Sequence, residues 1–245
     1  MLRINGATDR GLAREVNEDR FAGEVFDRKL GYAVVCDGMG GEAGGGIASG
    51  IACEEVRRMV ESSLRPRMEA HSLQLLLEGA ITNANLAIYD RAARAGEDYC
   101  GMGTTLCLAL VSGEEAVIAN VGDSRCYLLR GETLTQLTRD HTLAQQLIDR
   151  GAISPEEALQ SPDRHKLIRA VGVEREVSPD WYDILLQPGD TLLLCSDGLY
   201  NMLSPQALAE GLRQSVAADD PHILIELANA AGGADNITAV VIHNR

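Results

Sequence analysis

The chain reads YAVVCDGMGGEAGGG at residues 32–46, and this stretch sets the expected fold. Residues 32–36 form an apolar run, which predicts a buried strand. Asp37 follows the run directly, and an isolated Asp-Gly is typical of a hairpin turn. A hairpin needs a second strand immediately afterwards, but residues 38–46 lead into helical periodicity over residues 47–64. We therefore interpret Asp37 as a carboxylate that terminates a strand.

The same arrangement recurs along the chain. The other carboxylates at predicted strand ends are Asp123 after residues 116–121, Asp197 after residues 191–195, and Asp235 before residues 237–242. Strand ends can converge on one edge of a sheet, and carboxylates held together repel each other unless a cation compensates them. Oxygen ligands of this kind select magnesium, manganese or calcium over zinc. The sequence therefore predicts a metal site built from aspartates.

The remaining patterns predict a layered α+β protein. Further strand candidates lie at residues 104–111, 125–129 and 181–186, and further helical patterns lie at residues 73–94, 205–216 and 221–231. Strands in runs of two or three between paired helices, without regular βαβ alternation, favour antiparallel sheets covered by helices. Residues 142–179 are more polar and contain short helical patterns, including a possible capping box from Ser154 to Glu157, so they are interpreted as an insertion. No repeat or domain boundary is visible, which predicts a single domain.

Composition excludes several classes of function. A net charge of −14 argues against nucleic-acid binding, which needs a basic surface. No apolar stretch reaches the roughly 20 residues that span a bilayer, and residues 1–14 carry charges where a signal peptide would be apolar. We therefore expect a cytoplasmic protein with no membrane partner. The six cysteines lack a C-x-x-C pair and are expected to be reduced core residues, at positions 36, 53, 100, 107, 126 and 195.

The glycine run offers an alternative, a dinucleotide-binding enzyme, because Gly38-x-Gly40-x-x-Ala43 follows a strand and opens a helix. An aspartate directly before the loop suits a cation better than a pyrophosphate, which weighs against this alternative. The sequence also lacks Gly-Lys-Ser/Thr, His-Glu-x-x-His and Gly-x-Ser-x-Gly, and no cysteine has an arginine six positions later. Without a recognisable nucleophilic side chain, a metal-bound water is the natural nucleophile.

Six motifs spread over nearly the whole chain resemble, in order, those of the bacterial type 2C metal-dependent protein serine/threonine phosphatases. They are Thr8-Asp9-x-Gly11-x-x-Arg14-x-x-Asn17-Glu18-Asp19, Val35-Cys36-Asp37-Gly38-Met39-Gly40-Gly41, Gly103-Thr104-Thr105, Asn120-Val121-Gly122-Asp123-Ser124-Arg125, Cys195-Ser196-Asp197-Gly198-Leu199 and Ala234-Asp235-Asn236-Ile237-Thr238. The resemblance implies a four-layer αββα sandwich, with two central antiparallel β-sheets flanked by helices. It also implies one catalytic domain over residues 1–245, with a flap-like insertion at about residues 142–179 that borders the active site.

The resemblance further implies a metal site with two manganese or magnesium ions and a third ion nearby. By this likeness Asp37 bridges two metals, the backbone carbonyl of Gly38 binds the first, and Asp197 and Asp235 hold the second. Asp123 with Asp197 matches the third site, and Glu18 and Asp19 lie in or just behind the ligand shell. Arg14 matches the arginine that grips the substrate phosphate, a role that suits the bidentate guanidinium group.

The implied activity is hydrolysis of phosphoserine and phosphothreonine by a metal-activated water. Animal and plant relatives carry a histidine general acid where this chain has Met39, and methionine donates no proton. His141 is a candidate replacement, although a structural role is favoured for it. Implied partners are phosphoproteins, including a eukaryotic-like serine/threonine kinase in a signalling pathway, and the protein is expected to be a monomer. A catalytically inactive phosphoprotein-binding relative is the remaining alternative.

Overall fold

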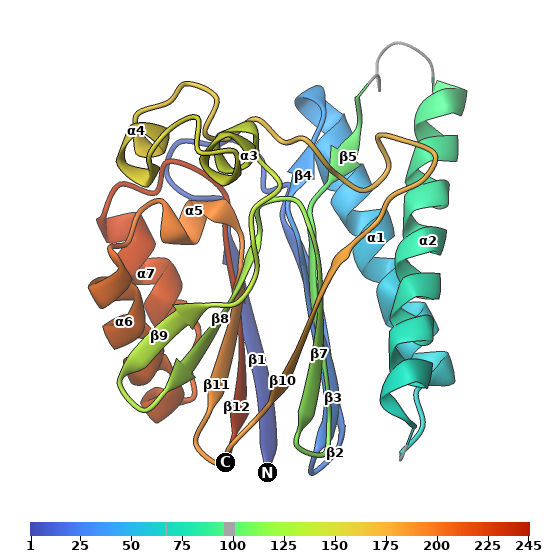
Figure 1. The fold of residues 1–245 in the computed structure, drawn as a ribbon, viewed down its shortest axis with the longest axis vertical. Helices are drawn as coiled ribbons and strands as arrows, with labels where there is room; N and C mark the ends of the chain where they lie inside the picture. The colour runs from blue at the N-terminus through green and yellow to red at the C-terminus, as the bar shows by residue number, and fades with distance from the viewer. Residues whose placement is uncertain (67, 96–100) are drawn as a thin grey trace.

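The computed structural model describes residues 1–66, 68–95 and 101–245, in which two antiparallel sheets lie between two layers of helices (Figure 1). One five-stranded sheet has the order β1 (Leu2–Asp9), β12 (Ile237–Asn244), β11 (Thr191–Cys195), β8 (Arg125–Arg130) and β9 (Thr133–Gln136). The other five-stranded sheet has the order β10 (Asp180–Leu185), β7 (Glu115–Val121), β6 (Leu106–Ser112), β3 (Leu30–Cys36) and β2 (Arg20–Asp27). All neighbouring strands in both sheets pair antiparallel.

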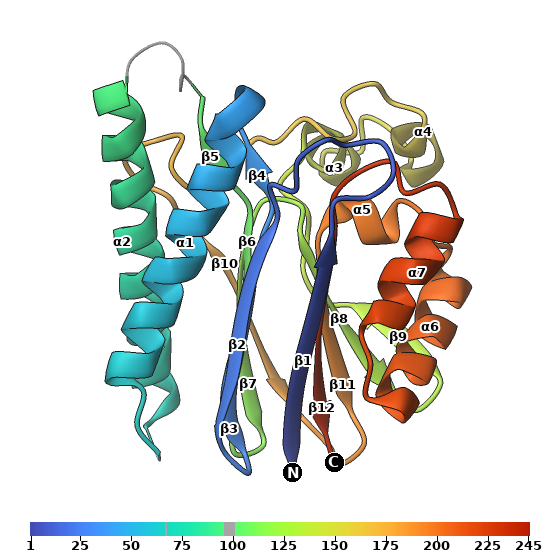
Figure 2. The same ribbon diagram turned by 180° about the vertical axis from the view of Figure 1, so that it is seen from behind.

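Helices form the two outer layers. The sheet that contains β3 is covered by α1 (Gly41–Ser63) and α2 (Ala70–Ala95), and the sheet that contains β11 is covered by α6 (Pro205–Ala218) and α7 (His222–Ala230) (Figure 1 and Figure 2). One buried apolar cluster fills the space between the sheets, and one lies between each sheet and its helices. The predicted α+β class and αββα sandwich are therefore confirmed.

The strand β3 shows why an unbroken apolar run becomes a strand in this fold. Tyr32 and Val34 pack in the cluster beneath α1 and α2, whereas Ala33 and Val35 pack between the two sheets. Successive side chains of a strand point to opposite faces. A strand with helices on one face and a sheet on the other is therefore apolar at every position, and its sequence shows no alternation of apolar and polar residues.

Every strand and helix predicted from apolar patterns is present, but three strands of the two five-stranded sheets were not predicted. These are β1, β2 and β9, and all three lie at the edge of a sheet. Edge strands have one side without a partner and carry more polar side chains. In β2 none of the residues is fully buried, so its sequence gives neither an apolar run nor a regular alternation.

The glycine-rich stretch has a structural role in bringing two backbones together. A Cβ atom on Gly38 would lie 2.1 Å from the backbone oxygen of Gly45, so only glycine allows β4 (Gly38–Met39) to approach the first turns of α1. The strand β4 pairs with β5 (Gly103–Thr104). The helix α1 begins at Gly41, six residues before the predicted start at residue 47.

The dinucleotide-binding hypothesis was wrong, because the described sheets contain no parallel βαβ unit.

Residues 142–179 connect β9 with β10, and thus join one edge of each sheet. They contain α3 (Leu143–Asp149) and α4 (Pro155–Leu159), which lie over the end of the sandwich where β3, β7 and β11 finish (Figure 1). The predicted capping box is confirmed, because the backbone N–H of Ser154 donates to Glu157 and the N–H of Glu157 donates to the Ser154 hydroxyl.

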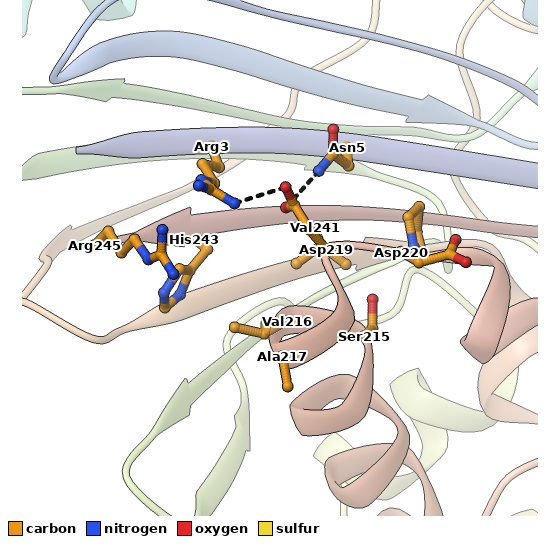
Figure 3. Close-up of a pocket in the computed structure, with 11 residues that line it drawn as sticks. Arg3, Asn5, Ser215, Val216, Ala217, Asp219, Asp220, Val241, His243 and Arg245 are labelled. Carbon is orange, nitrogen blue, oxygen red and sulfur yellow. Dashed lines mark hydrogen bonds and ion pairs between the residues drawn. The ribbon is translucent and has the colours of Figure 1, made fainter.

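A network between a helix end and β1 fixes the outer layer elsewhere in the molecule (Figure 3). Asp219 ends α6 in the left-handed conformation, with φ 59°. Its carboxylate accepts hydrogen bonds from Arg3 at 2.6 Å and from Asn5 at 2.8 Å. These residues line a cavity of about 170 Å³, and the pairing of Asp219 with β1 stabilises the turn between α6 and α7.

The cysteines at positions 36, 53, 107, 126 and 195 are buried free thiols, as predicted, and Cys100 lies outside the described residues. Burial raises the pKa of the Cys53 thiol to about 11, which keeps it protonated at neutral pH. Within the described part of the chain, no helix combines the length and apolarity that crossing a bilayer requires.

Candidate metal centre

A cleft of about 590 Å³ lies at the end of the sandwich where the strand-end aspartates are located. The cleft is lined by every residue predicted for the metal and phosphate site except Asp19, namely Arg14, Glu18, Asp37, Gly38, Asp123, Asp197 and Asp235. They come from both sheets and from the loop between β1 and β2. Residues far apart in the sequence therefore converge as the strand-end pattern predicts.

Asp37 is held by the neighbouring residues of β5 and its continuation. The Thr105 hydroxyl accepts the Asp37 N–H at 2.9 Å, and the Asp37 carbonyl accepts the Thr105 N–H at 2.8 Å and the Thr104 hydroxyl at 2.9 Å. Burial at the base of the cleft raises the pKa of Asp37 well above its ordinary value, and the carboxylates of Asp19 and Asp197 add to the rise. The backbone therefore fixes a carboxylate where negative charge is unfavourable.

Asp123 lies in the turn after β7 and is only 5% exposed. The preceding Gly122 has φ 101°, and a Cβ atom there would lie 2.6 Å from the Thr105 side chain, so the turn requires glycine. Burial, and then the charge of the nearby Asp197 carboxylate, raise the pKa of Asp123 to about 7. Among the described residues, no side chain donates a hydrogen bond to the Asp123 carboxylate.

Asp19 lies behind the cleft wall and is fully buried. Its Oδ2 atom accepts hydrogen bonds from Ser196 at 2.6 Å and Thr238 at 2.7 Å, whereas Oδ1 has no partner. Burial raises the pKa of Asp19 to about 6, although both hydroxyls oppose the rise. A buried carboxylate oxygen without a donor is costly, and a cation or an ordered water would satisfy it.

Among the residues that the structure describes, Arg14 is the arginine that lines the cleft. One guanidinium nitrogen donates to Asp235 Oδ2 at 2.8 Å, and the side chain is 55% exposed. This hydrogen bond, and then the charge of Asp235, raise the pKa of Arg14. The remaining guanidinium N–H groups are therefore available to an anion that enters the cleft.

Residues 12–224 match the family model described as protein phosphatase 2C. The chain belongs to the protein phosphatase 2C family. It is 39% identical to the serine/threonine phosphatase stp of Listeria innocua over 96% of this chain and 93% of that protein.

The solved structures that are similar to this chain include two of the phosphatase PstP. The Mycobacterium tuberculosis serine/threonine phosphatase PstP has a TM-score of 0.88 and 38% identity, with coverage of 99% of this chain and 98% of that chain. The catalytic domain of PstP in complex with two manganese ions has a TM-score of 0.85 and 37% identity, with coverage of 99% and 97%. These similarities confirm the predicted class of enzyme, a serine/threonine phosphatase of the 2C type, and the inactive alternative gains no support.

His165 was missed by the sequence analysis. It belongs to the segment 142–179 and lines the cleft, with Nδ1 3.4 Å from Asp197 Oδ2. The hydrogen bond to Asp197 raises the pKa of His165. Donor atoms of Asp123, His165 and Asp197 all lie within 4.8 Å of one another, a spacing that suits a metal ion. No sequence motif points to His165, because only the folding of residues 142–179 brings it next to Asp197.

His141 has a structural role, as favoured from the sequence. Its Nδ1 accepts the Gly122 N–H at 3.1 Å, and Nε2 lies 3.2 Å from Asp180 Oδ2. Burial lowers the pKa of His141, so the neutral ring that this bonding pattern needs is favoured. The ring fixes the turn before Asp123 and does not line the cleft.

One side chain, that of Asn236, makes three hydrogen bonds to the loop that carries Arg14. Asn236 donates from Nδ2 to the backbone oxygens of Arg10 at 3.0 Å and Val16 at 2.9 Å, and its Oδ1 accepts the Glu18 N–H at 2.8 Å. Asn236 is nearly buried, so these bonds are shielded from water.

We expect Asn236→Ala to release this loop. Loss of three hydrogen bonds at about 1 kcal/mol each corresponds to a fall in Tm of roughly 5–10 °C. The kcat/KM for a phosphothreonine peptide is expected to fall about tenfold, because Arg14 loses its fixed position. Thermal denaturation and steady-state kinetics measure the two effects. Asn5→Ala, which removes the bond to Asp219, is the matched control and should retain full activity, whereas an unchanged Tm for Asn236→Ala would contradict this role.

The carboxylate cluster also predicts how the stability of cation-free protein depends on pH. The pKa values of Asp19 and Asp123 are raised from 3.8 to about 6 and about 7, so the folded state binds protons more tightly than the unfolded chain. Their stabilising contribution is fully present below about pH 4 and is lost as pH rises through 6 to 7.

In EDTA, we therefore expect the Tm at pH 8 to be lower than the Tm at pH 5 by at least about 5 °C. Manganese should restore the Tm at pH 8, because the cation replaces the protons. Differential scanning fluorimetry measures both effects. Asp123→Asn should reduce the dependence on pH, and a Tm in EDTA that rises from pH 5 to pH 8 would contradict the clustering of these carboxylates.

Proposed function

We propose that this cleft is the active site for hydrolysis of phosphoserine and phosphothreonine side chains in proteins. The observation that carries the proposal is the collection of Asp37, Asp123, Asp197 and Asp235 in one cleft together with Arg14. Four carboxylates gathered in one cleft, with raised pKa values at Asp37 and Asp123, favour a compensating cation, and an exposed guanidinium group beside them favours a phosphate. Neither feature alone would distinguish a phosphatase from a simple cation-binding protein.

The donor set fits manganese or magnesium, because the donors that line the cleft are almost wholly oxygens, and the buried Asp19 behind them has an unpartnered Oδ1. The residues that would hold two core ions and a third are Asp37, the backbone carbonyl of Gly38, Asp123, Asp197 and Asp235, with Asp19 and Glu18 behind them. His165 is placed to join Asp123 and Asp197. When bound, divalent cations supply a water of lowered pKa and positive charge that attracts the phosphate.

The residues of the chain position the substrate. Arg14 binds phosphate oxygens with the N–H groups that Asp235 leaves available, and this pairing also orients the guanidinium plane. The Asp37 backbone, fixed by Thr104 and Thr105, sets the position of the carboxylate relative to Arg14. Met39 lines the cleft and has no proton to donate, so the proton for the departing alkoxide comes from another position.

The partners of the proposed enzyme are phosphoproteins, including a eukaryotic-like serine/threonine kinase in its phosphorylated form. The proposed setting is a cytoplasmic signalling pathway in which the chain acts as a monomer. Residues 1–245 form one catalytic domain, and residues 142–179 act as a flap beside the active site. The position of α3 and α4 over the cleft end of the sandwich supports the role of a flap (Figure 1).

Hydrolysis of a phosphothreonine peptide in the presence of manganese tests the proposal. We expect turnover that EDTA abolishes and that added manganese restores. The same peptide carrying phosphotyrosine provides a comparison for the substrate class. Phosphate release that is equal with EDTA and with manganese would contradict the metal-dependent reaction.

A further inference from the structure

A second cavity, of about 250 Å³, adjoins the cleft. Met39 and Leu167 line both cavities, so the second cavity continues directly from the proposed active site. Its other lining residues belong to the stretch 168–177, which follows His165 in the segment 142–179. We call this second cavity the flank groove. A polypeptide that places a phosphorylated residue in the cleft can extend its neighbouring residues along the groove, because each extended residue spans about 3.3 Å.

The flank groove presents aliphatic side chains to solvent. Ile168 is 46% exposed and Val173 is 42% exposed, and Val177 is half-buried beside them. Gly103 lies beneath the groove, where a Cβ atom would be 2.7 Å from Val173 Cγ2 and 3.0 Å from Met39 Cε. The absence of a side chain at this position leaves the space that Val173 and Met39 occupy. Exposed aliphatic side chains in a concave site suit an aliphatic side chain of a ligand.

The wall of the groove is anchored to the helical layer and is therefore preformed. Asn85 of α2 is buried, and its Nδ2 donates to the backbone oxygens of Glu174 and Arg175, each at 3.0 Å. Its Oδ1 accepts the Gly172 N–H at 2.7 Å. An isolated antiparallel bridge to β5 provides a second anchor. Binding at a preformed wall avoids the entropic cost of ordering it.

The flank groove is acidic. Glu174 and Glu176 line it, and in the described part of the chain neither forms an ion pair. Arg169 also lines the groove, but its guanidinium group already donates to Asp180 at 2.6 Å and to the Ser178 carbonyl at 3.0 Å. The groove therefore has uncompensated negative charge, in a protein whose net charge is −14. A ligand with positive charge complements this surface.

We propose that the flank groove binds the substrate polypeptide beside its phosphorylated residue and selects an aliphatic residue together with a lysine or arginine. This inference rests on the proposed function, because the position of the phosphorylated residue in the cleft places the neighbouring residues at the groove. Met39 and Leu167 line both the cleft and the groove, so the two are continuous. Glu174 and Glu176 give the groove its preference for a positively charged residue.

Phosphothreonine peptides test the selectivity. Each of the four positions on either side of phosphothreonine is changed in turn from alanine to arginine, glutamate or leucine, and kcat/KM is measured for each peptide with manganese. On one side of the phosphothreonine, we expect arginine to exceed glutamate by about fivefold, the scale of one favourable exposed ion pair. Leucine should exceed alanine at a neighbouring position.

The matching variant is Glu174→Gln with Glu176→Gln, which removes charge from two exposed side chains. It should lose the preference for arginine over glutamate while hydrolysing p-nitrophenyl phosphate, which has no flanking residues, at the unchanged rate. The control is Glu24→Gln with Glu132→Gln, which makes the same change in net charge at exposed positions on other strands and turns. It should keep the preference. Val173→Ser should reduce the preference for leucine and leave the preference for arginine.

Two results would overturn the inference. One is equal hydrolysis of arginine and glutamate peptides at every position, and the other is an unchanged preference in the Glu174→Gln, Glu176→Gln variant. Fluorescence anisotropy of labelled versions of these peptides, in EDTA and at an ionic strength near 0.1 M, measures binding without turnover. Absence of hydrolysis of every peptide and of p-nitrophenyl phosphate would contradict the proposed function, whereas anisotropy still decides whether the groove distinguishes the peptides.

Discussion

Asp37→Asn is expected to lower kcat/KM for a phosphothreonine peptide by at least about a thousandfold, because the change removes the carboxylate that the proposed assignment places between two cations. The amide has nearly the same size and can keep the backbone bonds with Thr104 and Thr105. The loss should therefore come from cation binding. Stopped and continuous phosphate-release assays, with manganese varied up to millimolar concentrations, measure it.

The same variant should be more stable than the wild-type chain when both are in EDTA. The pKa of Asp37 is raised by burial and by its neighbours Asp19 and Asp197, so the neutral amide relieves an unfavourable charge. A higher Tm together with lost activity separates a site effect from misfolding. Asp183→Asn, an exposed aspartate on β10, is the matched control and should change neither quantity. Full activity in Asp37→Asn would refute the assignment of Asp37.

Arg14→Ala is expected to lower kcat/KM about a hundredfold, which corresponds to the loss of one or two charge-assisted hydrogen bonds to phosphate. Arg14→Lys should restore only part of the loss, because an ammonium group keeps the charge and lacks the planar fork. Manganese affinity should change little, because Arg14 does not bind the cation. Isothermal titration calorimetry measures that affinity.

Arg28→Ala provides the control for Arg14, since it removes an exposed arginine from the turn between β2 and β3. It should leave kcat/KM unchanged. Full recovery by Arg14→Lys would show that charge alone is needed and would contradict bidentate binding. A large loss of manganese affinity in Arg14→Ala would instead assign Arg14 to the support of Asp235, its partner at 2.8 Å.

The sequence was sufficient to predict the central part of the fold and the position of the aspartates. Strands buried on both faces, such as β3 and β11, give unbroken apolar runs that are visible without a structure. The residue after such a run must lie at the end of the sandwich, which makes Asp37 easy to locate. Edge strands are harder, because the half-buried and exposed residues of β2 follow no simple period.

Tertiary contacts explain what the sequence could not predict in the site. The burial of Asp19, with one oxygen bound by hydroxyls of Ser196 and Thr238, depends on strands that are distant in the chain. His165 reaches the cleft only because residues 142–179 cross from one sheet to the other. No local spacing encodes either contact. The resemblance to known phosphatases located the motif that contains Asp19 but offered nothing for His165.

The clustered aspartates that form the site also lower the stability of the cation-free protein. A chain that buries Asp19 and Asp123 with pKa values of about 6 and about 7 loses stability at neutral pH unless a cation is bound. The hydrogen bonds around Asp37 and Asn236 hold the site together despite this repulsion. The cation therefore stabilises the fold as well as serving the reaction, and its removal should affect both.

We propose that the cleft holds divalent cations through Asp37, Asp197 and Asp235. Crystals grown without metal and soaked in manganese test it most directly, through anomalous difference peaks recorded near the manganese absorption edge. We predict at least two peaks within about 2.5 Å of these carboxylates, with loss of peaks in Asp37→Asn. A third peak near Asp123 and His165 would extend the site. A fully soaked crystal with no anomalous peak in the cleft would rule out this metal site.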